Sequence, residues 1–558
     1  MKRFSKKLIV YSPLFGLFFY WIFILLGISL SFPIQVIPDE TSQLLNIYGL
    51  INSGGLKLPY ETYYTVWVHY SFLPFTIVYW VSEFLMLGMP PLNEFKVHVA
   101  ANYIDTLPFL RAISAFIFLF SAWLVSLVIK DKFSKKASYL FIIFLALDLL
   151  LFINLHYSKH WIIDFAWIFI SIYLYWVYLN NRSNVFLIFA GIFFSFAVFS
   201  SHPLIIAGLY HLYLLAETRP SNKVVIKDLG ISISIFLVMF LLTLWLGPGK
   251  ILSEIFFSGS STQVQTNISL DVIYDFLYTL VDYNFVLTAF FMFSIFYMII
   301  KKNFQIFLLI IPFLSYLLLI SLYHFEQRYA LFLIITMALV AAVGISKINN
   351  RLWLSPLLLV MIFINFAILL SWHLIIIQKD TRISTLEWIL NNSSDESFII
   401  YNTLGFNYAP ITKKGINFIE SNFPNAIGTR ERLHLSLGLP DGINGIILRK
   451  IEEGRYKGSD LISALISNGY KPVLTNERFG YDAYFHQPAP TTYEDILDNC
   501  EFKVESIFLP YDQIPNNFEV YGDILYNFSN VIKSLKVFKR PGPIMTIYTF
   551  NQNQPESC

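Results

Sequence analysis

Long apolar runs separated by short polar connections fill most of the first 378 residues. About 20 apolar residues in helical conformation cross the hydrocarbon core of a bilayer, and many of the runs approach this length. The pattern therefore predicts a polytopic α-helical membrane protein. The runs lie at about 8–32, 109–129, 137–155, 161–179, 185–200, 203–216, 229–246, 284–300, 304–323, 328–346 and 353–377. The pair at 185–200 and 203–216 is short and is also compatible with a re-entrant hairpin.

Lysine and arginine between the runs predict the topology. One further run, 66–88, is ambiguous, and loops rich in these residues stay on the cytoplasmic side of a membrane. If 66–88 does not cross, the N-terminal MKRFSKK and all the basic connections fall on that side. We therefore predict about 11 transmembrane helices in the inner (plasma) membrane, with the N-terminus cytoplasmic and the C-terminus outside. The connections are KDKFSKK (130–136), NNRSN (180–184), ETRPSNKVVIKD (217–228), KKN (301–303) and SKINNR (346–351).

Two exterior segments follow from this topology. The first, 33–108, is a long loop within the transmembrane domain 1–378, and the run 66–88 would be a juxtamembrane element of it. Its stretch Asp39–Asn52 is predicted to be an amphipathic helix in the membrane interface, which ends at Gly54-Gly55. The apolar face of that helix comprises Leu44, Leu45, Ile47, Tyr48 and Ile51.

The second exterior segment, 379–558, has the helix and strand signals of an α/β domain. We expect helices at Ser384–Asn391 and Asp460–Asn468. We expect strands at Glu396–Tyr401, Lys471–Leu474, Phe502–Leu509 and Ile544–Phe550. The predicted fold class is thus a helical membrane bundle with a C-terminal exterior α/β domain.

Composition agrees with a membrane protein and excludes other classes. The chain is 56% hydrophobic and 14% charged, whereas soluble domains carry roughly a quarter of charged residues. A net charge of +2 indicates no nucleic-acid partner. Two cysteines exclude a disulfide framework or a cysteine-rich zinc site.

Chemically capable side chains gather at the predicted outer ends of the runs. Charges at the edge of a membrane domain are costly, so their placement is informative. The histidines of the membrane region lie mostly in this set, whereas the inner connections carry lysine and arginine. The set comprises Asp39, Glu40, Lys57, His69, Lys96, His98, Arg111, His156, Lys159, His160, Asp164, His202, His324, Glu326 and Arg328.

Several of these residues also have purely structural interpretations. Asp39 follows a proline and precedes a helix, so it would serve as an N-cap, and Glu40 would suit the helix dipole. His160 and Asp164 share a helical face, where a structural hydrogen bond is the better expectation than a metal site. Arg328 would anchor at lipid headgroups. Asp148, about two turns below the outer surface, is expected to hydrogen-bond within the bundle.

The order of these features resembles the GT-C superfamily of membrane glycosyltransferases, in particular the branch of protein O-mannosyltransferases and the aminoarabinose transferase of lipid A. Three motifs carry the resemblance: Pro38-Asp39-Glu40 after the first span, Leu110-Arg111-Ala112-Ile113-Ser114 at the second, and His324-Phe325-Glu326-Gln327-Arg328-Tyr329 before a late span. One turn departs from the family, because His156-Tyr157-Ser158-Lys159-His160 stands where members often have arginine and glutamate.

The resemblance implies transfer of a sugar, with inversion, from a polyprenyl-phosphate carrier to a hydroxyl of a glycolipid, polysaccharide or protein outside the cytoplasm. It makes Asp39 the general base, and Glu40 a partner in acceptor binding. Asp39 and Glu40 are also the candidates for a divalent metal. The lipid phosphate would be bound by Arg111, Lys159, Arg328 and Lys57. A possible acceptor site or second acidic site comprises His156, His160, Asp164, His202 and His324.

Two other classes of protein compete with this interpretation. A transporter or lipid flippase is also polytopic, but it typically shows repeats, broken helices or charges near the midplane. The sequence has no internal repeat, and Asp148 is its one prominent acid at depth. A membrane-anchored binding or assembly protein would not need the polar cluster on the spans.

Overall fold

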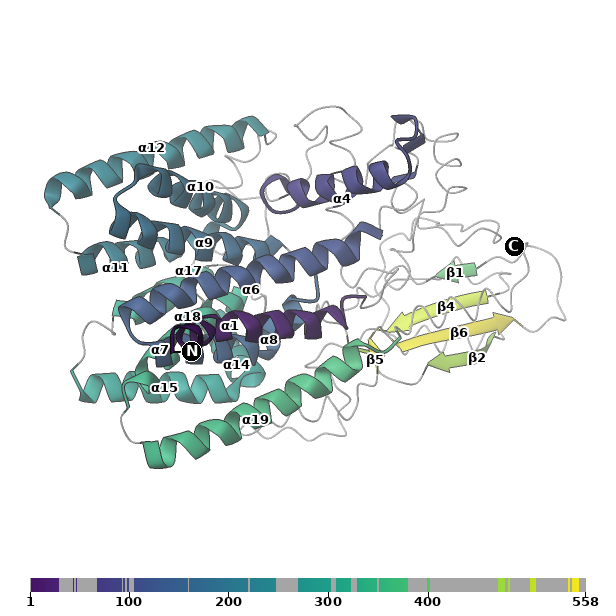
Figure 1. Cartoon of the computed structure of the whole chain (residues 1–558). Helices are drawn as coiled ribbons and strands as arrows, with labels where there is room; N and C mark the ends of the chain where they lie inside the picture. The colour runs from purple at the N-terminus through teal and green to yellow at the C-terminus, as the bar shows by residue number, and fades with distance from the viewer. Residues whose placement is uncertain are drawn as a thin grey trace.

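The structure is a computed structural model in which the membrane region is a bundle of helices with a small sheet at one end (Figure 1). Its described residues are 2–29, 44, 47, 68–92, 94–95, 98–99, 105–158, 160–218, 221–246, 269–302, 308–322, 329–348, 351–379, 399–401, 470–476, 480–481, 502–507, 540–541 and 544–550.

Helices lie on every apolar run that the sequence pattern indicates. Their bounds are α1 Lys2–Leu25, the π-helix η1 Val68–Phe72, α4 Leu73–Met86, α6 Thr106–Lys132, α7 Lys135–Ala146, α8 Leu149–Asn154, α9 His160–Asn181, α10 Asn184–Ser200, the 3-10 helix η3 His202–Ala207, α11 Gly208–Thr218, α12 Asn222–Leu246, α14 Leu270–Tyr283, α15 Phe285–Ile300, the 3-10 helix η4 Leu308–Ile310, α17 Ile311–Ile320, α18 Ala330–Ser346 and α19 Arg351–Ile376.

Several of these helices are long and apolar enough to cross a membrane, so the chain is a multi-pass membrane protein. Within the described residues there are 4 such helices, or up to 5 if the bent pair 270–281 and 285–300 is one span. The total of eleven spans stays a prediction. Helix α4 has 14 residues and is only about 21 Å long at the helical rise of 1.5 Å per residue. That is shorter than a hydrocarbon core, which agrees with the expectation that 66–88 does not cross.

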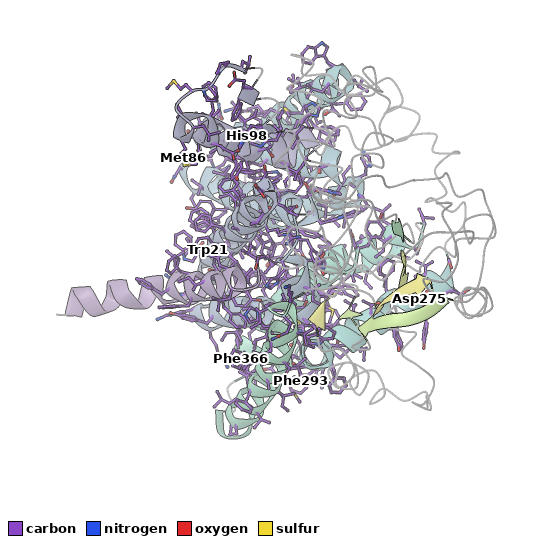
Figure 2. The ribbon with its side chains drawn as sticks, turned by 90° about the vertical axis from the view of Figure 1, so that its right-hand side faces the viewer. Trp21, Met86, His98, Asp275, Phe293 and Phe366 are labelled. Carbon is purple, nitrogen blue, oxygen red and sulfur yellow. The ribbon has the colours of Figure 1, made fainter. Side chains whose placement is uncertain are left out.

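The bundle is organised around α18, which is buried along nearly its whole length. Helices α7, α15 and α17 pack against it, and its small residues allow the close approach. A Cβ at Gly344 would lie 2.4 Å from Ser294 Cβ on α15. The peripheral helices instead expose large apolar side chains, such as Phe293 of α15 and Phe366 of α19 (Figure 2). A bundle with an apolar exterior is what a lipid environment requires.

The basic connections all lie at the end of the bundle away from the sheet, which we call the basic end. Hydrogen bonds join one connection to the next there, so the sequence has correctly grouped them on one side. Which side of the membrane this is stays a prediction. The bonds run from Lys136 Nζ to the Ile345 carbonyl (3.2 Å), from Trp176 Nε1 to Asp131 Oδ2 (3.0 Å), from Lys227 Nζ to Asn184 Oδ1 (3.1 Å) and from the Tyr297 hydroxyl to the Lys347 carbonyl (3.4 Å).

The predicted continuous run 137–155 is wrong in one respect, because it is two helices divided at Asp148. This residue has an extended backbone, and its Oδ1 accepts from the Leu151 N–H at 2.8 Å, so it caps α8. Its Oδ2 accepts from Asn284 Nδ2 at 3.0 Å. Asn284 in turn caps α15 and accepts from Asn365 Nδ2 at 3.0 Å. The expectation that Asp148 hydrogen-bonds within the bundle is confirmed.

Replacing Asp148 by alanine is expected to destabilise the bundle by about 2–4 kcal/mol, because it removes a helix cap and leaves the buried Asn284 amide unpaired. Asp148→Asn retains the capping oxygen and is expected to cost less. Unfolding of the purified protein in a detergent series measures both. The exposed Asp271→Ala is the control; a D148A variant as stable as this control contradicts the prediction.

Helix α14 was not expected from the sequence. Ser269 Oγ accepts from the Val272 N–H at 3.3 Å and starts the helix. Val272, Phe276 and Leu280 follow at a spacing of four residues and are buried. The helix is amphipathic, so its polar residues hide it from a search for continuous apolar runs.

The C-terminal part contains a four-stranded mixed sheet in the order β1-β4-β6-β2. Strand β4 pairs in parallel with β1, while β6 pairs antiparallel with β4 and β2. These strands confirm the four that the sequence predicts, whereas the short pair β3–β5 was not expected. The predicted helices Ser384–Asn391 and Asp460–Asn468 lie outside the described residues, so the α/β character stays a prediction. The bounds are β1 Ile399–Tyr401, β2 Tyr470–Asn476, β3 Gly480–Tyr481, β4 Phe502–Ile507, β5 Arg540–Pro541 and β6 Ile544–Phe550.

Candidate functional site

Arg111 joins the start of α6 to the end of α1. Its side chain is fully buried, and Nη1 donates to the Ile28 carbonyl at 3.1 Å. One turn deeper, Trp21 Nε1 of α1 donates to the Ala112 carbonyl at 3.0 Å. The chain that leaves this end of α1 reaches the acidic pair Asp39-Glu40 about ten residues later. The structure thus places Arg111 beside the point from which that pair emerges.

His156 reaches the same turn at the end of α1. Its Nδ1 lies 2.9 Å from the Phe152 carbonyl, which can only accept, so Nδ1 carries the proton. Its Nε2 lies against Gly27, where a Cβ would come within 2.8 Å of it, so only glycine permits this approach. No described residue gives Nε2 a hydrogen bond. Arg111 and His156 therefore contact neighbouring residues of one turn.

His373, near the end of α19, completes this group and was not singled out from the sequence. Its ring centroid lies 6.0 Å from that of His156 and 3.9 Å from that of Phe23. It is 2% exposed, and neither ring nitrogen has a hydrogen-bond partner within the described ranges. The predicted topology already places the end of 353–377 outside, so the rule that selected the other histidines would also have found His373.

Asp164 forms a second polar group. Its carboxylate is fully buried and accepts from three hydroxyls: Ser71 at 3.0 Å, Ser200 at 2.9 Å and Ser201 at 2.6 Å. These serines come from η1 and from the break between α10 and η3. The expected structural hydrogen bond of Asp164 is thus present, but its printed partners are serines rather than His160. The carboxylate fastens the first exterior loop to the membrane bundle.

The predicted amphipathic helix packs between these two groups. Only Leu44 and Ile47 of Asp39–Asn52 are described; both are helical, belong to the predicted apolar face and are fully buried. They share one apolar cluster with Leu107 and Leu110, which precede Arg111, and with Ile163, which precedes Asp164. The helix that begins at Asp39 is therefore held against the start of α6.

A third polar group lies where α4 approaches the start of α6. His98 Nε2 is 3.1 Å from Glu83 Oε1, and His98 lies at the edge of the bundle (Figure 2). Asp105 precedes α6 nearby. Partial burial raises the pKa of the Asp105 carboxyl, and the negative charge of Glu83 raises it further.

The remaining predicted site residues fall into two sets. His160 is buried and lies against Trp161, with ring centroids 4.5 Å apart, whereas His202 is exposed. The structure therefore does not bring His202 to Asp164 as its neighbours Ser200 and Ser201 are brought. The positions outside the described residues are Asp39, Glu40, Lys57, Lys159, His324 and Arg328.

The described residues include no group of three His, Cys, Asp or Glu that could hold a metal ion. Since Asp39 and Glu40 lie outside this part, a metal at the acidic pair stays a prediction.

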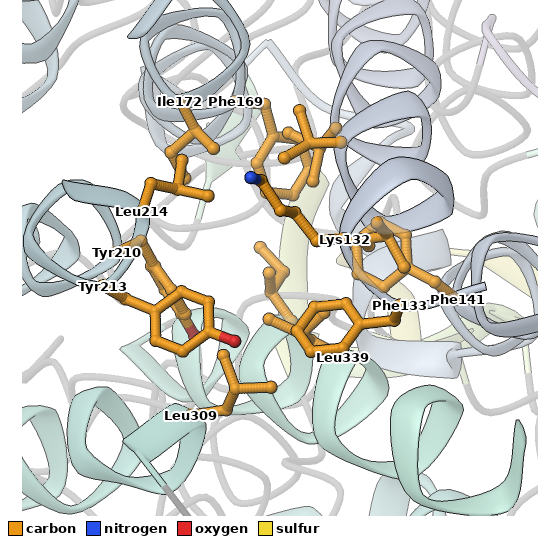
Figure 3. Close-up of a pocket in the computed structure, with 14 residues that line it drawn as sticks. Lys132, Phe133, Phe141, Phe169, Ile172, Tyr210, Tyr213, Leu214, Leu309 and Leu339 are labelled. Atoms are coloured by element: carbon orange, nitrogen blue, oxygen red, sulfur yellow. The ribbon is translucent and has the colours of Figure 1, made fainter. Parts of the chain in front are cut away.

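A small cavity lies at the basic end and is separate from these groups. It has a volume of about 60 Å³ and is lined mainly by apolar side chains of α6, α9, α11 and α18. Lys132 and Tyr213 are among the side chains around it (Figure 3). Its size and its distance along the bundle from Arg111 exclude it as part of the outer site.

Removing the Asp164 carboxylate is expected to release η1 from the bundle. Asp164→Ala leaves three buried or half-buried hydroxyls without their acceptor, each costing about 1–3 kcal/mol if it stays unpaired. Amide hydrogen exchange of residues 68–72 should accelerate about tenfold or more. Asp164→Asn keeps one acceptor and should show a smaller effect. Ser171→Ala, elsewhere on α9, is the control; unchanged exchange in D164A contradicts this role.

The arrangement defines a multi-pass membrane protein with polar groups gathered where α1, α6, α9 and α19 approach the sheet end. No protein-family model matches the chain, and no curated protein does so either.

Three solved structures are similar to it. ArnT from Cupriavidus metallidurans in the apo state is 11% identical, with a TM-score of 0.43 over 76% of this chain and 77% of that one. The same protein bound to undecaprenyl phosphate has the same identity and score over 96% and 97%. The arabinofuranosyltransferase AftD from Mycobacteria is 13% identical, with a TM-score of 0.39 over 96% of this chain and 40% of that one. The similarity to ArnT agrees in kind with the GT-C resemblance of the sequence.

Proposed function

We propose that the protein is a membrane glycosyltransferase that transfers a sugar, with inversion, from a polyprenyl-phosphate carrier to an acceptor hydroxyl. The observation that carries the proposal is the hydrogen bond from Arg111 to Ile28. It brings the proposed phosphate-binding cation to the end of α1, from which the acidic pair Asp39-Glu40 follows. The packing of Leu44 and Ile47 beside Leu110 supports the same juxtaposition.

The chemistry assigns complementary roles to the two charges. The Asp39 carboxylate accepts the proton of the acceptor hydroxyl, whose oxygen attacks the anomeric carbon of the donor. The bond between that carbon and the phosphate oxygen breaks, and the polyprenyl phosphate leaves with its electron pair. The guanidinium of Arg111 stabilises the negative charge that develops on the phosphate. Lys57, Lys159 and Arg328 are further cations proposed for this role.

The position of Arg111 suits a lipid-linked donor. The residue lies at the start of a membrane-crossing helix, where a phosphate at headgroup depth would meet it while the polyprenyl tail extends along the bundle. A buried guanidinium forms stronger hydrogen bonds to phosphate than an exposed one, because water competes less. A glycolipid, surface polysaccharide or protein hydroxyl would approach from the side of the acidic pair.

A transfer assay with the purified full chain tests this function. The protein in detergent is incubated with polyprenyl-phosphate sugars and with glycans or glycolipids from the cell envelope, and the products are identified by mass spectrometry. We expect a sugar-bearing product and release of polyprenyl phosphate in detergent, without any sealed compartment. A flippase would instead move lipid only across intact vesicles. Such movement with no new glycosidic bond would overturn the proposal.

The proposed orientation is tested separately by reporter fusions. Alkaline phosphatase fused after Gln378 is expected to be active, because it folds only outside the cytoplasm, while a fusion after Arg182 is expected to be inactive. Fluorescent-protein fusions at the same two positions should give the opposite pattern. An inactive phosphatase after Gln378 would place the outer site on the wrong side of the membrane.

A further inference from the structure

A large groove separates α11 from α12 near the basic end. It has a volume of about 370 Å³, and its walls come from α9, α10, η3, α11 and α12. The walls are apolar, and several of their side chains, including Leu212, Ile233 and Leu237, are more than half exposed on the surface that faces lipid. Two glycines in the lining, Gly191 and Gly208, keep side chains out of it. The groove is therefore open to the hydrocarbon of the bilayer.

An acid belongs to the wall of this apolar groove. Asp228 stands four residues after the start of the span 224–246, which is about 6 Å inside it at 1.5 Å per residue. It is 2% exposed. Its Oδ1 accepts from the Tyr178 hydroxyl, and no described residue gives Oδ2 a hydrogen bond. An acid at this depth is costly unless something pairs with it.

Cations stand at the rim beside this acid. The guanidinium of Arg182 lies over the ring of Tyr178, 5.7 Å from its centroid, while the hydroxyl of the same tyrosine binds Asp228. Lys227, the neighbour of Asp228, donates to Asn184 at the exposed surface. From the rim inwards, the groove thus offers positive charge, then one buried carboxylate oxygen, then apolar walls.

We propose that this groove binds a zwitterionic aminophospholipid, with its ammonium paired to Asp228, its phosphate at Arg182 and Lys227, and an acyl chain along α11 and α12. The lipid's ammonium donates the hydrogen bond that Oδ2 lacks, after a small rotation of the Asp228 side chain opens this oxygen to the groove. The order of charges matches phosphoethanolamine, in which two carbons join phosphate to ammonium. An anionic lipid would satisfy the rim cations but would leave the carboxylate unpaired.

Native mass spectrometry of the full chain in detergent tests the proposal. The probes are phosphatidylethanolamine and phosphatidylcholine with identical acyl chains. Both are zwitterions, but the trimethylated ammonium of the second has no N–H to donate. We expect wild-type protein to retain phosphatidylethanolamine about tenfold more than phosphatidylcholine, since a hydrogen bond to a charged group distinguishes them. The Asp228→Asn variant should bring the ratio close to one.

Two further variants keep the test decisive. Asp131→Asn makes the same chemical change at the basic end outside the groove, and it should leave the ratio unchanged. Ile233→Trp fills the groove without touching the charges, and it should lower retention of both lipids at least severalfold. Equal retention of the two lipids by wild-type protein overturns the proposal. So does stronger retention of phosphatidylglycerol, which would assign the groove to the cations alone.

Discussion

Replacing Asp39 by asparagine is expected to reduce sugar transfer by about 10²–10⁴-fold, the usual contribution of a general base. The amide cannot accept the proton of the acceptor hydroxyl. Binding of the polyprenyl-phosphate donor should change little, because its phosphate contacts cations rather than this acid. Transfer rates of purified wild-type and D39N protein, with donor binding measured separately, give the two quantities.

The same variant distinguishes catalysis from helix capping. Asparagine and serine cap helices about as well as aspartate does, so D39N and D39S should fold and keep Leu44 and Ile47 in their buried positions. If Asp39 only caps the helix, both variants will transfer sugar at the wild-type rate. Glu40→Gln is the matched control at the adjacent position and is expected to affect acceptor binding more than the rate at saturation. Full activity of D39N contradicts the proposed base.

Replacing Arg111 by methionine is expected to reduce transfer by about 10²–10³-fold, because the leaving phosphate loses a preorganised cation. Methionine preserves much of the apolar stem, so the contacts of the side chain with the bundle are largely kept. Arg111→Lys retains the charge but not the planar fork of donors, so an intermediate loss is expected. Kinetics over a range of donor concentrations separate weaker binding from a slower chemical step.

A structural role for Arg111 would give a different result. The bond to Ile28 also fastens α1 to α6, so R111M is expected to lower stability, and its unfolding must be measured beside its activity. The informative readout is protection by ligand: polyprenyl phosphate should stabilise wild-type protein against unfolding and should stabilise R111M much less. Arg182→Met, at the basic end, should retain the full protection. Equal protection of R111M and wild type would remove Arg111 from the donor site.

The sequence predicts much of the membrane region because its signals are local. Apolar runs and basic connections each depend on neighbouring residues, and the structure has helices on the runs and hydrogen bonds between the connections. Strands β4 and β6 were found in the same way, from short apolar stretches next to turns. Helix α14 escaped because its apolar residues recur every fourth position rather than continuously.

The polar groups of the site could be predicted as candidates but not as contacts. Asp164 and Ser71 are 93 residues apart in the sequence, and no local pattern indicates that they meet. The proximity of His156 to Gly27 depends on how closely α1 approaches the turn after α8, which is a matter of packing. His202 shows the opposite error, since its position at an outer end does not direct its side chain into the bundle.

The hydrogen bonds at the basic end have a consequence for motion during turnover. They join α6 to α9, α7 and α15 to α18, and α10 to α12, so relative sliding of these helices at that end would break several bonds at once. The opposite ends are connected by the long first loop and by the segments between spans. We therefore expect the bundle to behave as a hinge fixed at the basic end, with admission of a lipid substrate opening the helices at the sheet end. Distances between spin labels placed at the two ends should vary widely at the sheet end and little at the basic end.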